Sequence, residues 1–297
     1  PSHPQNHVIL PPASPVVVTR NNENAIAIEF CDLLLDNELT KDLHTYYAAD
    51  KVYKNYGFKN GNPWNTSVQF KTRTVARDTF GTNTGFTATY HFNIKNSFDF
   101  STLKAVVERA SLWSISINGT EIKPEAGKWW LDREFGVFNI GGLAKKGDNT
   151  LILKANPMKV HAEIEPVYIT GNFSVIPSEK GWAIVPAVKT LTTGSWKDQG
   201  MPFYSWGVTY SQEYSIEKPE GQYFVRLNKW SGTVAEVTVN DKTAPVIAFP
   251  PYESDITGLI GTGSNKIQVK VTGSLKNLMG PHFNNPRPGL VSPGSFR

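Results

Sequence analysis

An internal repeat divides this chain of 297 residues into two related parts. Residues 85–94 resemble residues 207–216, with Gly, Thr, an aromatic residue and Ile in register. The next matching block ends at Asn118 in the first copy and at Asn240 in the second, at the same distance from the first block. Blocks repeated at a fixed spacing indicate two copies of one structural unit.

A third block completes each copy. It has the pattern Ile-x-x-Leu-x-x-x-Gly-x-Asn and occupies residues 140–149 and 256–265. The distance from Asn118 to Ile140 is 22 positions, whereas Asn240 to Ile256 is 16 positions. The first copy therefore carries six extra residues, all in one loop.

Apolar and polar residues alternate within the repeat, for example in residues 150–155 and 266–271. Alternation places one face of a strand on a core and the other in water. Asn118-Gly119 and Asn240-Asp241 suit tight hairpin turns. No stretch, residues 33–50 included, shows a sustained helical period. We therefore predict an all-β protein of two tandem antiparallel β-sandwiches of the jelly-roll type.

The length suits two domains of ordinary size. Before the first copy, residues 25–30 and 67–72 are strand candidates, and residues 161–175 would form a closing strand pair after it. The predicted parts are an extended N-terminal segment (1–24), a first sandwich (25–177), a second sandwich (178–279) and an extended C-terminal tail (280–297).

Composition argues against several classes of function. The 30 basic and 26 acidic side chains are spread along the chain without a basic block, so we expect no nucleic-acid partner. Cys31 is the only cysteine, so no internal disulfide can form. No apolar run approaches the length of about 20 residues that a membrane helix needs. No nucleotide motif and no histidine spacing typical of zinc sites occurs, so no cofactor is expected.

Several motifs resemble glycoside hydrolase segments. Asp255-Ile-Thr-Gly-Leu259 with Gly263-Ser-Asn265, and residues 196–204, resemble the galactose-binding-like jelly roll of family 2 glycoside hydrolases. Residues 129–135, 163–168 and 280–285 resemble segments near the C-terminus of large bacterial rhamnosidase-like hydrolases.

This resemblance implies a non-catalytic pair of accessory modules, secreted or periplasmic, from an enzyme that degrades plant polysaccharides. The catalytic barrel of such enzymes is a separate domain, and a chain of this length cannot hold one beside two sandwiches. The implied partners are a carbohydrate and that catalytic domain.

A sugar site combines exposed aromatic rings with planar polar groups. Adjacent residues on a strand point in opposite directions, so at least one tryptophan of the pair 129–130 should be in the core. Trp64 is expected on a loop. The candidate sugar contacts are Trp129, Trp130 and Arg133 in the first copy, and Tyr204, Trp206, Arg226, Asn228, Trp230 and Tyr252 in the second.

Two alternatives remain open. Both sandwiches could be scaffolding without a ligand. The chain could also be a glycosidase that uses Glu163 or Glu165, which are two apart on an expected strand and so share a face, as do Asp132 and Glu134. Hydrolysis would need a second carboxylate from another strand about 5–10 Å away. A structural calcium ion is a further expectation, without assigned ligands.

Overall fold

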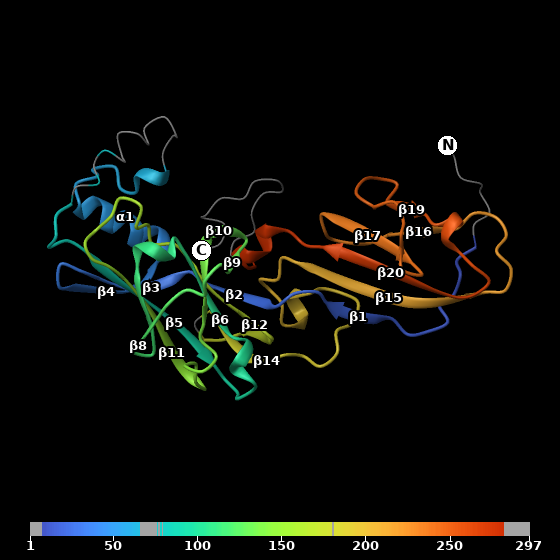
Figure 1. Ribbon diagram of the computed structural model, residues 1–297, viewed down its shortest axis with the longest axis horizontal. Coiled ribbons are helices and arrows are strands. Elements are labelled where there is room, and N and C mark those ends of the chain that lie inside the picture. Colours follow the sequence, from blue (N-terminus) through green and yellow to red (C-terminus); the bar gives the residue numbers. More distant parts are fainter. Residues whose placement is uncertain (1–7, 66–75, 77, 79, 180, 282–297) are drawn as a thin grey trace. The chain divides into compact units, whose positions relative to one another are not determined.

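The computed structural model describes residues 8–65, 76, 78, 80–179 and 181–281 (Figure 1). Strands in mostly antiparallel sheets form two compact units. One is Asn24–Ala187, which we call the central unit. The other combines Pro1–Glu23 with Val188–Arg297, and we call it the flanking unit. The predicted all-β fold is confirmed.

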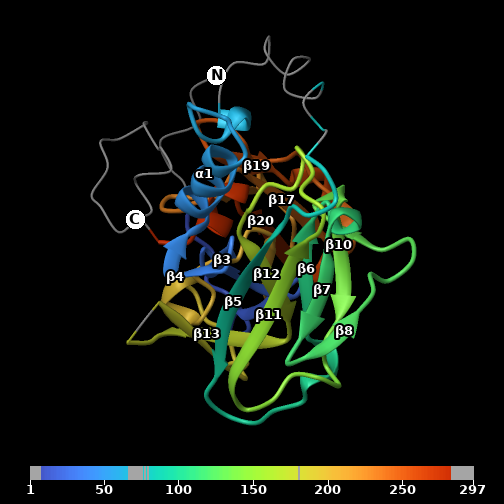
Figure 2. The same cartoon turned by 90° about the vertical axis from the view of Figure 1, so that its left-hand side faces the viewer.

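Two sheets make the central unit. The five-stranded sheet has the order β2-β12-β6-β10-β9. The larger sheet has the order β13-β14-β5-β11-β7-β8, with β3 on β5 and β4 on β3, and Figure 2 shows β5 beside β11. The strands are β2 (Asn24–Ile28), β3 (Phe30–Leu35), β4 (Glu38–His44), β5 (Phe86–Ile94), β6 (Lys104–Glu108), β7 (Ser114–Ile117), β8 (Thr120–Ile122), β9 (Trp129–Trp130), β10 (Asp132–Asn139), β11 (Gly147–Ala155), β12 (Val167–Gly171), β13 (Phe173–Pro177) and β14 (Trp182–Pro186).

Alternation along β5 builds one wall of the central core. Phe86, Ala88, Tyr90, Phe92 and Ile94 are buried, and the residues between them are at least partly exposed. Burying a side chain of the larger kinds stabilises the fold by about 1.5–3 kcal/mol. In contrast, β2 is buried at all five positions, because both of its faces are covered.

The flanking unit contains one five-stranded sheet in the order β1-β15-β20-β17-β18 and the pair β16-β19. Buried residues such as Val237, Val239 and Ile256 form its core. The strands are β1 (Val17–Arg20), β15 (Gly207–Ile216), β16 (Phe224–Arg226), β17 (Val234–Val239), β18 (Lys242–Thr243), β19 (Glu253–Asp255) and β20 (Gly263–Thr272).

The repeat has the same three-dimensional form in both units. β5 pairs with β11 as β15 pairs with β20, and the hairpin β7-β8 corresponds to β17-β18. The two residues of each hairpin turn have positive φ: 48° and 86° at Asn118 and Gly119, 48° and 64° at Asn240 and Asp241. Two-residue turns of this kind match the twist of the strands, and both predicted turns are confirmed.

The parts of the chain differ in extent from those expected. β14 pairs with β13 and with β5, so the central unit continues to Ala187 rather than ending at residue 177. Residues 17–20 of the expected N-terminal segment are β1, an outer strand of the flanking sheet. The expected closing pair at 161–175 is instead two strands in different sheets: β12, which begins only at Val167, pairs with β2 and β6, and β13 pairs with β14. The expected strand 67–72 and most of the tail lie outside the described residues.

A helix within the first copy was not expected. α1 (Thr45–Asn55) buries Ala48, Ala49, Val52 and Tyr53 along one side. The His44 side chain accepts a hydrogen bond from the backbone of Tyr46 at its N-terminus, as an N-cap residue does. Within the described part of the chain, no helix is long and apolar enough to cross a membrane.

Candidate functional site

Polar and aromatic side chains gather at one end of the five-stranded sheet of the central unit. Glu108, the last residue of β6, pairs with Phe135 of β10. Tyr168 of β12 pairs with Val106, two residues before Glu108. Paired residues and residues two apart share a face of a sheet. Glu108, Phe135 and Tyr168 therefore project from the same face.

Trp130 completes an aromatic group with these rings. Its ring centroid lies 5.0 Å from that of Tyr168 and 6.4 Å from that of Phe135, and the latter two are 6.3 Å apart. All three side chains are half-buried. We call Trp130, Phe135 and Tyr168 the aromatic triad. Tilted rings with one side accessible offer an apolar surface of the kind that binds the C–H face of a sugar.

Carboxyl groups lie near Tyr168 of the triad, because burial first, and then the charges of Glu165, Glu29 and Glu108, raise the pKa of its hydroxyl. Burial first, and then the charges of Glu163 and Glu108, raise the pKa of Glu165 to about 8, and Glu165 is hydrogen-bonded to Glu163. Burial also raises the pKa of Glu108, an effect that the Arg109 guanidinium opposes. Burial raises the pKa of Glu29, which follows β2, to about 7. Glu165 therefore carries a proton at neutral pH and can donate a hydrogen bond.

The loop before β12 carries Glu163 and Glu165 and is tied down on one side by residues 62–64. The Asn62 amide donates a hydrogen bond to Glu163 Oε1 at 2.5 Å. Trp64 Nε1 donates to the Val160 carbonyl at 2.9 Å. The two glutamates were expected on a strand, but residues 161–166 are irregular and the strand begins after them.

Arg109 and His161 close this side of the site. The His161 ring stacks on Trp64 at 4.9 Å with an interplanar angle of 21°. The Arg109 guanidinium carbon lies 5.8 Å from the Trp64 ring centroid, and Nη1 lies 3.3 Å from His161 Nδ1. Arg109 is thus held as a fixed cation beside the carboxyl groups.

The residues predicted for the first copy have different environments. Trp130 belongs to the aromatic triad, whereas Trp129 is 55% exposed beside it. Leu131 joins them to β10 and has a φ of +63°. Arg133 is exposed.

The candidates of the second copy fall into two groups. Tyr204 is 1% exposed, and its hydroxyl donates to the Gly207 carbonyl, so it is a core residue rather than a sugar contact. Trp206 packs beside it against Met201 and Val208. Trp230, Tyr252, Arg226 and Asn228 lie together at the end of β16 and β19.

The sequence did not indicate Glu29, Glu108, Arg109, Phe135 or Tyr168 as a group. Glu163 and Glu165 stand close to Tyr168 in the chain, and that cluster could have been noticed. The pairing of Glu108 with Phe135 joins residues 27 positions apart, and no local pattern specifies it.

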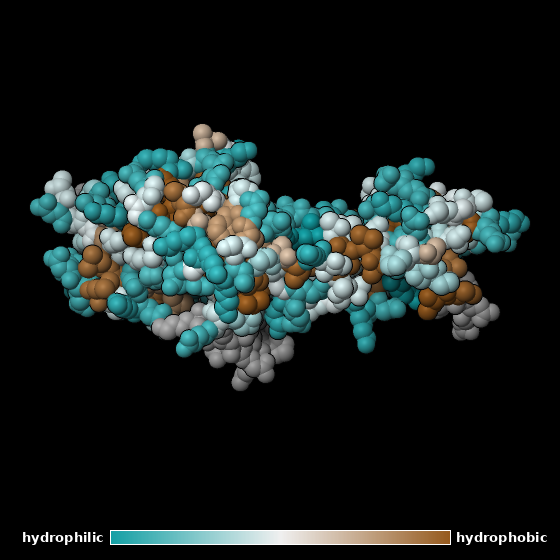
Figure 3. Space-filling view, turned by 90° about the horizontal axis from the view of Figure 1, so that it is seen from below, coloured by the Kyte–Doolittle hydropathy of each residue, from teal (hydrophilic) through white to brown (hydrophobic). Residues whose placement is uncertain are grey.

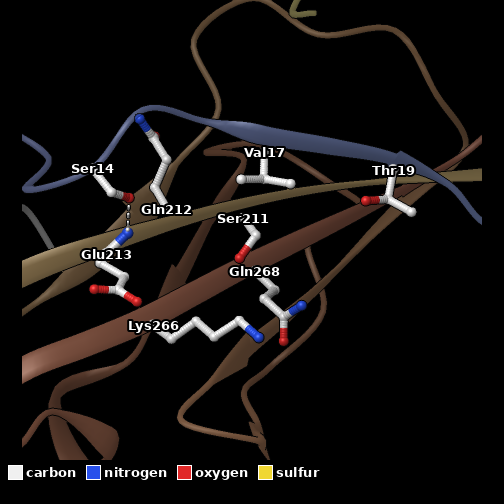
Figure 4. A pocket seen from close by; sticks show the side chains of 8 residues that line it. All are labelled: Ser14, Val17, Thr19, Ser211, Gln212, Glu213, Lys266 and Gln268. Carbon is white, nitrogen blue, oxygen red and sulfur yellow. Dashed lines mark hydrogen bonds between the residues drawn. The ribbon is translucent and has the colours of Figure 1, made fainter. Parts of the chain in front are cut away.

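A separate hollow of about 300 Å³ lies on the flanking sheet (Figure 4). None of the side chains that line it is aromatic, so it offers no ring for stacking. The hollow is lined by Ser14, Val17, Thr19, Ser211, Gln212, Glu213, Lys266 and Gln268.

On the face of the molecule in Figure 3, hydrophobic residues form separate patches with hydrophilic residues between them.

Among the described residues, no group of three or more His, Cys, Asp or Glu could hold a metal ion. A calcium ion bound through backbone carbonyls stays a prediction.

The comparisons with known proteins lead to glycoside hydrolases. No protein family model matches the chain. A stretch of 120 residues is 27% identical to the "Putative beta-glucuronidase" of Formosa agariphila and covers 38% of this chain but 10% of that protein.

Solved structures show the same kinds of enzyme. The Streptomyces avermitilis alpha-L-rhamnosidase matches 63% of this chain and 22% of its own, with 12% identity and a TM-score of 0.28. The Dictyoglomus thermophilum beta-D-glucuronidase matches 86% of this chain and 39% of its own, with 11% identity and a TM-score of 0.31. The chain thus spans well under half of the length of each of these proteins.

Proposed function

We propose that the chain is a non-catalytic accessory part of a glycoside hydrolase and that its central unit binds a carbohydrate at the aromatic triad. The observation that carries this proposal is the group of half-buried rings of Trp130, Phe135 and Tyr168 at one end of one sheet. Glu108 lies on the same face as Phe135 and Tyr168, and Glu165 lies in the loop that leads to Tyr168. The rings supply a stacking surface, the protonated carboxyl of Glu165 supplies a hydrogen-bond donor, and the carboxyl oxygens supply acceptors for sugar hydroxyls.

The wider setting follows from the resemblance. The partners would be a plant polysaccharide and the catalytic domain of the parent enzyme, in a secreted or periplasmic location. The relatives named above are sugar hydrolases, and the chain matches only part of each.

The test is binding of the purified chain to immobilised plant polysaccharides and a glycan array, with Trp130→Ala and Trp129→Ala as variants. Loss of the Trp130 ring should weaken binding about tenfold, which corresponds to about 1.4 kcal/mol of stacking. Tyr47→Ala is a matched control, since Tyr47 is an exposed aromatic residue of the same unit on α1. Unchanged binding by the Trp130 variant would remove the triad from the site, and no binding to any glycan would favour scaffolding.

Hydrolysis is a second candidate function, favoured by one observation. Glu108 comes from β6, a different element from Glu165, and its charge acts on Glu165. A protonated and an ionised carboxyl group are what a glycosidase uses. We rank hydrolysis second because burial raises the pKa of Glu108 as well, which disfavours the ionised carboxylate that hydrolysis needs. Release of a chromogenic aglycone that Glu165→Gln abolishes and Glu220→Gln leaves intact would establish it.

A further inference from the structure

The flanking unit carries exposed aromatic side chains at the end of its β16-β19 pair. Phe249 is 82% exposed and Tyr252 is 36% exposed. Tyr252 packs edge-on against Trp230 at 5.6 Å and 77°, and its N–H donates to the Phe249 carbonyl at 2.9 Å. We call Phe249, Tyr252 and Trp230 the aromatic tip.

The tip occupies the place that corresponds to the site in the central unit. β16 pairs with β19 as β6 pairs with β10, and both β10 and β19 lie between the repeated hairpin turn and the third repeated block. One further backbone hydrogen bond continues each strand pair at the same end. In the β16-β19 pair, Leu227 N–H donates to the Tyr252 carbonyl at 3.0 Å, and in the β6-β10 pair, Arg109 N–H donates to the Glu134 carbonyl at 2.7 Å. The aromatic residues of both loops therefore stand at the same end of the duplicated fold.

The two loops also share a backbone feature. Leu131 directly precedes β10 with a φ of +63°, and Tyr252 directly precedes β19 with a φ of +54°. A bulky residue in this conformation is unfavourable and persists only where the surroundings impose it. In each unit, a large ring lies beside this positive-φ position at the start of the strand: Trp130 before β10 in the central unit and Tyr252 before β19 in the flanking unit.

Polar groups beside the tip complete a surface for sugars. The Arg226 guanidinium is fixed by Glu253, with Nη2 at 2.8 Å and Nε at 2.9 Å from Oε2. Asn228 and Lys229 are exposed next to Trp230. Planar polar groups around exposed rings are the combination that binds a sugar chain from one side.

We propose that the aromatic tip is a second carbohydrate-binding surface, which stacks on the sugar rings of a polysaccharide independently of the central site. This inference rests on the proposed function. The central site is half-buried and rich in carboxyl groups, whereas the tip is open and carries Arg226 and Lys229. The tip therefore accepts a sugar chain along its length, and each of the two units has a binding surface of its own.

The experiment compares Phe249→Ala/Tyr252→Asn with Trp130→Ala and with Leu275→Ala, a control that removes an exposed apolar side chain of the flanking unit. Asn tolerates positive φ, so the double variant removes both rings without adding backbone strain. The single Phe249→Ala variant, which alters an exposed side chain, serves if the double variant does not fold. The readouts are depletion onto an insoluble polysaccharide and calorimetric stoichiometry with a soluble oligosaccharide of the same sugar.

We expect the tip variant to lose at least about tenfold in affinity for the insoluble polysaccharide and its stoichiometry to fall from two to one. Full retention by the tip variants together with weakened binding by Trp130→Ala would overturn the second surface and leave the proposed function standing. Weakened binding by the tip variants alone would support the tip and refute the site at the triad. Absence of binding by the unaltered chain would refute the proposed function and this inference with it.

Discussion

Asn149 and Asn265 form the same hydrogen-bond network in the two units. Each is fully buried, and each side chain donates to the carbonyls of the residues four and two positions earlier and accepts from the N–H of the earlier one. Each amide oxygen also accepts from the Asn of the hairpin turn, Asn118 or Asn240, at 2.9 Å. The final Asn of the third block thus has the same role in both copies. Its side chain connects the hairpin turn with the loop that leads into β11 or β20.

Replacing Asn149 with Ala should lower the free energy of unfolding of the central unit by about 2–4 kcal/mol, because several buried partners lose their hydrogen bonds at once. Asn265→Ala should do the same in the flanking unit. Hydrogen exchange measured by mass spectrometry separates the units. Asn96→Ala, at an exposed position of the central unit, is the control and should cost less than about 1 kcal/mol. An effect of Asn149→Ala no larger than the control would contradict the prediction.

The second residue of the hairpin turn offers a reciprocal pair of substitutions. Asp241 has a φ of +64°, where the first copy has Gly119 at +86°. Asp241→Gly should stabilise the flanking unit by about 0.5–1 kcal/mol and Gly119→Asp should destabilise the central unit by a similar amount, since Gly adopts this conformation freely. No atom lies within 4 Å of a Cβ at Gly119, so the effect is one of backbone conformation. Thermal unfolding monitors both, and shifts in the same direction would refute the explanation.

The repeat made the strands β5, β11, β15 and β20 and both turns predictable, because alternation and turn residues are local signals. Helix α1 was missed because residues 33–50 combine part of β3, all of β4 and the first half of the helix, so that no single period extends across them. β1 could not be assigned from the sequence, because its partner strand β15 follows the whole central unit in the chain.

Only part of the site was predictable. Trp129 and Trp130 are adjacent in the sequence, and Glu163 and Glu165 are two positions apart, so each pair could be recognised from the sequence alone. Contact between Trp130 and Tyr168 depends on the register of strands far apart in the chain, which only the packed sheet fixes.

The stability of the central unit should fall as pH rises. Burial and the neighbouring Glu163 and Glu108 raise the pKa of Glu165 from 4.5 to about 8, with Arg109 acting in the opposite direction. The folded state therefore binds a proton that the unfolded state has released, and stability is lost between about pH 4.5 and pH 8, on the order of a few kcal/mol.

Urea unfolding at pH 5 and pH 8 measures this loss. Glu165→Gln should make the free energy of unfolding less dependent on pH and should raise it at pH 8. Glu29, whose pKa is about 7, accounts for the pH dependence that remains. Glu220→Gln, at an exposed carboxylate of the flanking unit, should change neither value. Equal slopes in Glu165→Gln and the unaltered chain would count against a protonated Glu165.

Charge should set the preference of the central site among ligands. The charges of Asp132, Glu134 and Glu163 act on Glu108, while Arg109 supplies the opposing cation. A uronic acid bound there would add a further negative charge, so a neutral oligosaccharide should bind about tenfold more tightly than its uronic counterpart at low salt. Added salt and Glu108→Gln should narrow the difference, whereas Glu121→Gln, at an exposed position, should not. Tighter binding of the uronic ligand in calorimetry would reverse the inferred sign.

The pairing of β1 with β15 has a consequence for biosynthesis. The strand Val17–Arg20 is made before the central unit, but its partner β15 emerges from the ribosome only after all of Asn24–Ala187 has been translated. At about 5–20 residues per second, the central unit has seconds in which to fold while that early strand has no partner. The central unit is thus inserted into the sequence of the flanking unit, and the flanking unit cannot be completed until the residues after Ala187 have been translated.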